Sequence, residues 1–75
     1  MQISKSELEL ISELIKELRK KKGLSQEEFS HLINIDRKYA SLIEKGDRNL
    51  SILMLLKITK GLGISLGDFF EKLNL

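Results

Sequence analysis

Apolar residues recur every three or four positions along most of the chain, which is the spacing of helices with one buried face. In the first segment the pattern is carried by Ile11, Leu14, Ile15 and Leu18. Ser6 precedes this segment as a candidate N-cap, and glutamates near its start and basic residues at its end complement a helix dipole. We therefore expect a first helix that ends at Gly23.

Two short helices are predicted next. Ser25 and Glu28 have the spacing of a capping box, so a second helix should begin directly after Ser25. Asn34 interrupts the apolar pattern of this helix. Asp36 can then cap a third helix, which would end at Gly46.

The connection between these two helices has the features of a helix-turn-helix. Two helices that cross steeply through a short turn need apolar inner faces, a small residue where they approach, and a turn residue that tolerates positive φ. Ser30 is small, and Asn34 enters the left-handed region readily. The apolar contacts would come from Phe29, Ile33, Ile35, Ala40 and Ile43. An ordinary helical hairpin is the alternative, but the joint match favours a helix-turn-helix over residues 25–45.

The C-terminal part predicts two more helices. Ser51 can cap a fourth helix that ends within residues 61–63, and Ser65 can cap a fifth. The chain has 75 residues, no proline and no strand pattern. We therefore expect one all-α domain over residues 1–75, folded as a compact five-helix bundle with the helix-turn-helix in its second and third helices.

The last two helices carry more apolar residues than a small core needs. The inner face of the fourth helix is expected to consist of Ile52, Leu55, Ile58 and Leu62. That assignment leaves Leu53, Met54 and Leu56 as a surplus, to which Leu75 adds at the end of the chain. One alternative is that the core uses them all; we favour a homodimer formed by the fifth helix and the residues before it. Its expected interface consists of Ile64, Leu66, Phe69, Phe70 and Leu73.

The charges are unevenly distributed, although the net charge is only +2. Residues 1–18 contain two lysines and four glutamates, whereas residues 19–48 contain eight basic and five acidic residues. A polyanion such as DNA would therefore be attracted to the middle of the chain.

Several classes of function are excluded by composition. The absence of cysteine rules out disulfides and thiolate chemistry, and the single histidine, His31, has no second ligand with which to share a metal. No arrangement of a histidine and an acid that could activate a serine nucleophile is evident, so we expect no enzyme, metal or cofactor. The apolar run 52–56 is far shorter than the ~20 residues that cross a bilayer, and no signal-peptide pattern is present. A cytoplasmic protein without membrane contact is expected.

Five segments carry a family resemblance. GLSQEEF at 23–29, IEKG at 43–46 and LGIS at 62–65 resemble the lambda-repressor and Cro-type (XRE) helix-turn-helix family over nearly the whole chain. Within that family, IDRKYASLIE at 35–44 and RNLS at 48–51 are similar to the controller proteins of restriction-modification systems. The resemblance implies a DNA-binding fold whose third helix enters the major groove.

The first residues of that recognition helix are the candidate base readers, Arg37, Lys38, Tyr39 and Ser41. Arg37 can bind guanine O6 and N7 with both arms of its guanidinium, a contact worth ~1 to 3 kcal/mol of discrimination; its alternative is pairing with a nearby carboxylate. Lys38 would reach a base or a phosphate, and many controllers carry threonine there. Tyr39 would either pack under the turn or, as the resemblance implies, present its hydroxyl to DNA.

A second set is expected to contact the sugar-phosphate backbone: Gln26, Lys22, Arg19, Lys45, Arg48 and Asn49. Gln26 would hold a phosphate at the start of its helix and, as the resemblance suggests, brace the recognition helix; simple solvation is its alternative. Glu44 is expected to pair with a basic neighbour and to stay away from DNA. A solvated surface is the simpler expectation for Lys20 and Lys21.

These features favour a transcriptional regulator that binds a palindromic operator in double-stranded DNA as a homodimer, with its recognition helices about 34 Å apart. A restriction-modification controller is the leading interpretation, and RNA polymerase is a candidate partner. An antitoxin or phage-type repressor is the alternative within DNA binding. A protein-interaction module that sequesters a partner through the apolar surplus is the alternative from another class.

Overall fold

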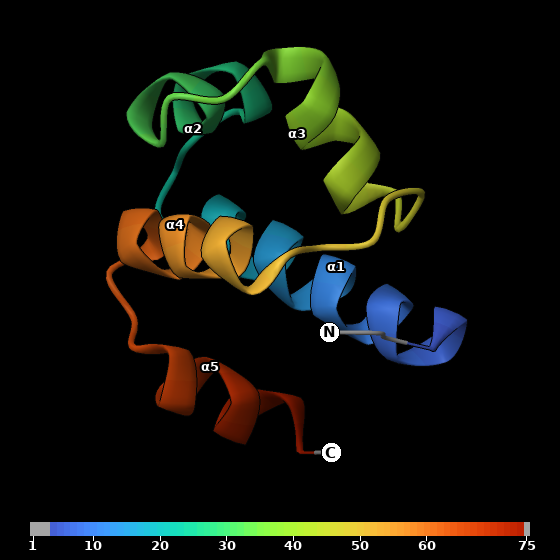
Figure 1. The fold of residues 1–75 in the computed structure, drawn as a ribbon. Coiled ribbons are helices and arrows are strands. Elements are labelled where there is room, and N and C mark those ends of the chain that lie inside the picture. The colour runs from blue at the N-terminus through green and yellow to red at the C-terminus, as the bar shows by residue number, and fades with distance from the viewer. Residues whose placement is uncertain (1–3, 75) are drawn as a thin grey trace.

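Five α-helices form the regular structure of residues 4–74, the part of the chain that the computed structural model describes. They are α1 (Lys5–Lys21), α2 (Gln26–Leu32), α3 (Arg37–Glu44), α4 (Ile52–Leu62) and α5 (Leu66–Leu73). Figure 1 shows α1 and α4 crossing the middle of the molecule, with α2 and α3 on one side and α5 on the other. The predicted all-helical, five-helix fold is confirmed.

Serine side chains begin four of the five helices, because each accepts a hydrogen bond from an otherwise free backbone N–H. Ser25, Ser51 and Ser65 cap α2, α4 and α5 as predicted. The prediction for α1 was wrong by two residues: Ser4 is the N-cap and forms a capping box with Glu7, while Ser6 lies in the first turn.

The core is built from the inner faces of all five helices. Its buried apolar residues are Leu8, Ile11, Ile15, Phe29, Ile33, Ala40, Ile43, Leu50, Leu55, Ile58, Leu62 and Phe69. The predicted inner face of α4 needs one correction: Ile52 is 42% exposed, and Thr59 is buried instead. The Thr59 hydroxyl donates to the Leu56 carbonyl at 3.1 Å, so a polar residue can occupy this position without an unsatisfied donor.

A glycine allows α4 to approach α2 closely. A Cβ placed on Gly61 would lie 2.2 Å from Cγ2 of Ile33, a distance that packed atoms do not tolerate. The sequence suggested only that the residues around Gly61 end the fourth helix. Gly63 is the residue that does so, with a left-handed φ of 72°.

The fifth helix closes the end of the core. Phe69 is 0% exposed and packs edge-on against Phe70, with 6.1 Å between ring centroids. A residue without exposed surface cannot contact a second chain, so the placement of Phe69 in a dimer interface is corrected. The other four predicted interface residues, Ile64, Leu66, Phe70 and Leu73, are half-buried, and Leu75 lies outside the described residues.

Candidate nucleic-acid interface

The turn between α2 and α3 has the predicted conformation. Asn34 adopts a φ of 57°, and the backbone N–H of Ile35 donates to the carbonyl of Ser30 at 2.9 Å. Ser30 is buried, and its hydroxyl donates to the Glu27 carbonyl at 2.8 Å. The small residue and the left-handed asparagine thus place α3 across α2, as a helix-turn-helix requires.

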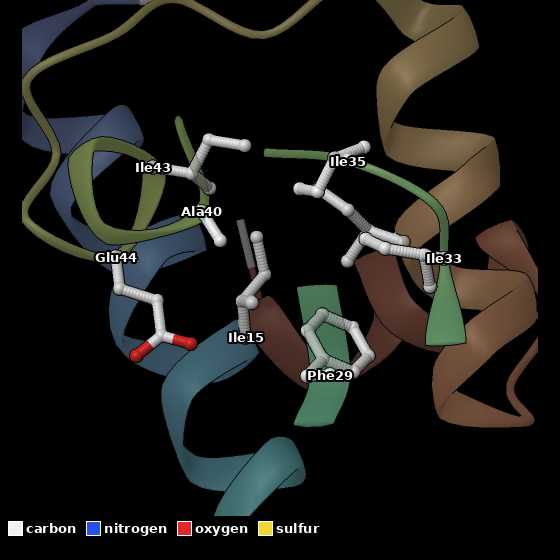
Figure 2. Close-up of a pocket in the computed structure, with 8 residues that line it drawn as sticks. Ile15, Phe29, Ile33, Ile35, Ala40, Ile43 and Glu44 are labelled. Atoms are coloured by element: carbon white, nitrogen blue, oxygen red, sulfur yellow. The ribbon is translucent and has the colours of Figure 1, made fainter. Parts of the chain in front are cut away.

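An apolar seam joins the two helices to the rest of the molecule. It is lined by Ile15, Phe29, Ile33, Ile35, Ala40, Ile43 and Ile58, with Glu44 at its edge. Figure 2 shows the labelled apolar side chains of this seam converging from α1, α2, α3 and the turn, with the Glu44 side chain beside them. The free space among them is only about 10 Å³, room for one water molecule at most. The inner face of α3 is therefore closely packed.

Glu44 joins the last turn of α3 to α1 through a buried ion pair. The guanidinium of Arg19 donates to both carboxylate oxygens, from Nε at 2.6 Å and from Nη2 at 3.0 Å. Its Nη1 donates to the Leu24 carbonyl at 2.6 Å. Glu44 was correctly expected to pair with a basic residue, but the expectation that Arg19 contacts DNA is corrected, because Arg19 is only 6% exposed and its guanidinium is already bound.

Gln26 connects α2 to the same carboxylate; we call the contacts of Glu44 with Arg19 and Gln26 the joint around Glu44. Its side-chain Nε2 donates to Oε1 of Glu44 at 3.2 Å, so the first residue of α2 braces the last residue of α3. Gln26 is half-buried, which leaves part of it at the surface beside the free N–H groups of the helix start. Donors from α1 and α2 thus hold the carboxylate of Glu44, and these contacts restrain the rotation of α3 about its axis.

The other side of α3 faces outward. Arg37, Lys38 and Lys45 are exposed, and Ser41 is half-buried. Lys38, Ser41 and Lys45 follow one another at spacings of three and four residues, so they share the side opposite the buried Ala40 and Ile43. The structure therefore brings three of the four predicted base readers, Arg37, Lys38 and Ser41, together with Lys45 onto adjoining parts of one surface.

Tyr39 lies at the border between these two sides. It is half-buried and packs against the core, which is the first of the two arrangements considered for it. Asp36 is the N-cap of α3, although within the described chain its side chain makes no capping hydrogen bond. The first turn of α3 contains the basic residues Arg37 and Lys38 and no acidic residue.

The remaining predicted backbone ligands lie on connections. Arg48 and Asn49 are exposed between α3 and α4. Lys22 is exposed too, but its Nζ lies beside Gly63 at the end of α4, 3.5 Å from where a Cβ on that glycine would be. No sequence pattern indicated that Lys57 contacts the helix-turn-helix. Its Nζ donates to the carbonyl of Asn34 at 3.2 Å, and no local pattern links two residues that are 23 positions apart.

Comparison with known proteins agrees with this geometry. The profile of the helix-turn-helix family matches residues 15–69. The control protein C.MunI from Mycoplasma sp is 50% identical over 61 residues, which are 80% of this chain and 82% of the relative. The control protein C.BamHI from Bacillus amyloliquefaciens is 33% identical over 63 residues, 83% of this chain and 78% of the relative.

A solved structure extends the likeness to three dimensions. The restriction-modification controller protein C.Esp1396I, crystallised as a tetramer with its natural 35-base-pair operator, is 45% identical to this chain. The superposition covers 88% of this chain and 87% of that one, with a TM-score of 0.83. The chain therefore belongs to the helix-turn-helix family, and it is similar to the controller proteins of restriction-modification systems.

Proposed function

We propose that this protein is a sequence-specific DNA-binding regulator that controls transcription in a restriction-modification system. The observation that carries the proposal is the exposed, basic outer side of α3, held in place by the buried joint around Glu44. Its relatives C.MunI and C.BamHI are control proteins, and C.Esp1396I binds operator DNA.

The start of α3 would enter the major groove, where Arg37 is suited to a guanine and Lys38 to a base or a neighbouring phosphate. Lys45, Arg48 and Asn49 would then bind the sugar-phosphate backbone on the far side of the helix. These contacts would set affinity and salt dependence, whereas Arg37 would set sequence preference. Gln26 uses one side-chain N–H for Glu44, so its second side-chain N–H and its backbone N–H at the helix start remain for a phosphate.

The protein would act as a homodimer in the cytoplasm, where its DNA is. Leu66, Phe70 and Leu73 keep part of their surface exposed on α5. On α4, Leu53 is 75% exposed and Leu56 is 44% exposed, so the predicted surplus is real at these two residues, while Met54 packs on the core. A second copy covering these residues would pair two recognition helices for a palindromic operator. RNA polymerase would be a further partner where the protein acts as an activator at a promoter.

Selection from a randomised duplex library tests the proposal. Wild type should enrich a palindrome whose half-site centres are about one DNA turn apart. Arg37→Ala should lose preference at one base pair of each half-site, by about 1 to 3 kcal/mol, and should keep its fold because Arg37 is exposed. Leu32→Ala, a change on an exposed part of α2, is the control. Weak binding without any enriched sequence would refute operator recognition and would point to a protein partner instead.

A further inference from the structure

Leu42 is an apolar residue on the outer side of the recognition helix. It is half-buried, and so are ten other apolar residues of the described chain, all of which pack against the core. These ten are Leu14, Leu18, Leu24, Ile35, Tyr39, Met54, Ile64, Leu66, Phe70 and Leu73. Within residues 4–74, Leu42 alone among the half-buried apolar residues is not packed against the core. The fold therefore gives no packing reason for a leucine at this position.

The neighbours of Leu42 are the candidate DNA ligands. Lys38 precedes it by four residues and Lys45 follows it by three, so both adjoin it on the helix surface. Ser41 lies next to it in sequence. An isobutyl group is thus placed among side chains that carry charges and hydroxyls, on the surface that the proposed function directs into the major groove.

The backbone holds Leu42 in a fixed position. Its carbonyl accepts a hydrogen bond from the N–H of Asp47 at 3.0 Å, and Gly46 between them has a left-handed φ of 75°. This arrangement ends α3 with a turn that closes back on Leu42. Because the inner side of α3 is also fixed by Glu44, the backbone that carries Leu42 does not need to be reordered when a ligand binds.

We propose that Leu42 reads a thymine of the operator through the C5-methyl group of that base. Thymine is the only one of the four DNA bases with an apolar group in the major groove, and a leucine side chain offers no hydrogen bond to the polar edges of the others. The inference rests on the proposed function, since it requires α3 to lie in the major groove. It adds an apolar reader to the polar readers expected from the sequence.

Replacement of thymine by deoxyuridine tests this contact, because it removes only the methyl group. Starting from the selected operator, each thymine of one half-site is replaced in turn and the Kd of wild type is measured. We expect one position at which deoxyuridine weakens binding about fourfold, the effect of losing one buried methyl group. Leu42→Ala should bind the thymine operator more weakly and should lose most of the distinction between the two bases at that position.

Two further variants make the result specific. Leu32→Ala makes the same truncation at a more exposed leucine of α2 and should keep the fourfold effect. Leu42→Gln should change the base selected at that position towards adenine, whose major-groove edge pairs with an amide. Operator binding that is equally sensitive to deoxyuridine in wild type and Leu42→Ala, or insensitive in wild type at every thymine, would overturn the role of Leu42 and leave the proposed function intact. Failure of wild type to bind any duplex specifically would overturn both.

Discussion

The inner side of α3 is buried and largely apolar, whereas its outer side is exposed and basic. Its inner side consists of Ala40, Ile43 and Glu44, which are 4%, 2% and 9% exposed. Its outer side presents Arg37 and Lys38, both exposed. One helix of eight residues therefore carries two separate tasks, since stability depends on its inner side and recognition on its outer side.

The difference shows how a short helix can read DNA. An isolated helix of this length is unstable in water, because too few hydrogen bonds offset the cost of nucleation. The apolar seam and the ion pair from Arg19 to Glu44 supply the missing stability from outside the helix. Residues on the outer side can therefore be substituted to match a different operator sequence without loss of the fold.

The largest expected effect comes from removing one partner of the buried ion pair on the inner side of α3. Arg19→Met would leave the Glu44 carboxylate buried with only Gln26 as a donor. We expect the free energy of unfolding to fall by about 3 to 5 kcal/mol, because an uncompensated buried charge is strongly destabilising. Urea unfolding followed by circular dichroism measures the change.

A double variant separates the cost of the lone charge from the value of the pair. Arg19→Met combined with Glu44→Leu should recover most of the lost stability, because apolar residues of similar volume often replace a buried ion pair at little cost. A single-variant loss under about 1 kcal/mol would mean that the pair behaves like an exposed one. The inner side would then owe its stability to the apolar seam alone.

The next effect tests the packing that supports the inner side from α4. Gly61→Ala would place a methyl group 2.2 Å from Cγ2 of Ile33, and the strain of about 1 to 3 kcal/mol should exceed the gain of about 1 kcal/mol in helix propensity. Gly67→Ala in α5 is the matched control, since nothing lies within 4 Å of its added Cβ, and it should stabilise by about 0.5 to 1 kcal/mol. Thermal unfolding of both variants should show shifts of opposite sign; a stabilised Gly61→Ala would contradict the close approach.

A smaller effect is expected when the outer side is changed. Lys45→Gln should leave stability within about 0.5 kcal/mol of wild type, because Lys45 is exposed. Its operator affinity should fall several-fold, and the slope of log K against log salt should decrease by about 0.9 for each phosphate contact removed. Lys20→Gln, an exposed lysine of α1 expected to be solvated, is the control and should leave the slope unchanged. Equal slopes for the two variants would remove Lys45 from the DNA contacts.

The features that could be predicted from the sequence are those in which a residue acts on its near neighbours. The caps at Ser25 and Ser65, the left-handed Asn34 and the buried Ser30 all depend on groups within a few residues of them. Local geometry decides these positions, so a short pattern contains the necessary information. The outward placement of Arg37 and Lys38 followed from the same helical period.

Apart from the α1 cap, which lies at Ser4 and not at Ser6, the predictions that failed depend on long-range contacts. Arg19 was grouped with surface cations because a basic residue near a helix end usually complements the dipole; its true partner, Glu44, is 25 positions away. Phe69 was assigned to a second chain because an amphipathic helix looks the same whether it packs on its own core or on a partner. Ile52 was taken as buried because it continues the apolar period, but the packing of α4 buries Thr59 instead.

The smallest expected effect concerns the start of α2, which carries Gln26 into the joint around Glu44. The backbone N–H of Ser25 donates to the Glu28 carboxylate at 2.8 Å and, together with the nearby Ser25 hydroxyl, lowers the pKa of that carboxyl below its ordinary value. The folded state therefore favours the ionised form, and this contribution to stability is fully present above the ordinary glutamate pKa of about 4.3. This contribution is lost as the pH falls through the lowered pKa.

Glu28→Gln keeps a capping side chain without the charge. The stability difference between wild type and Glu28→Gln should therefore be constant from pH 8 to about pH 5 and should shrink in more acidic solution. Urea unfolding at a series of pH values measures it, and a difference that stays constant to the acid limit of folding would show that ionisation of Glu28 contributes nothing to the cap.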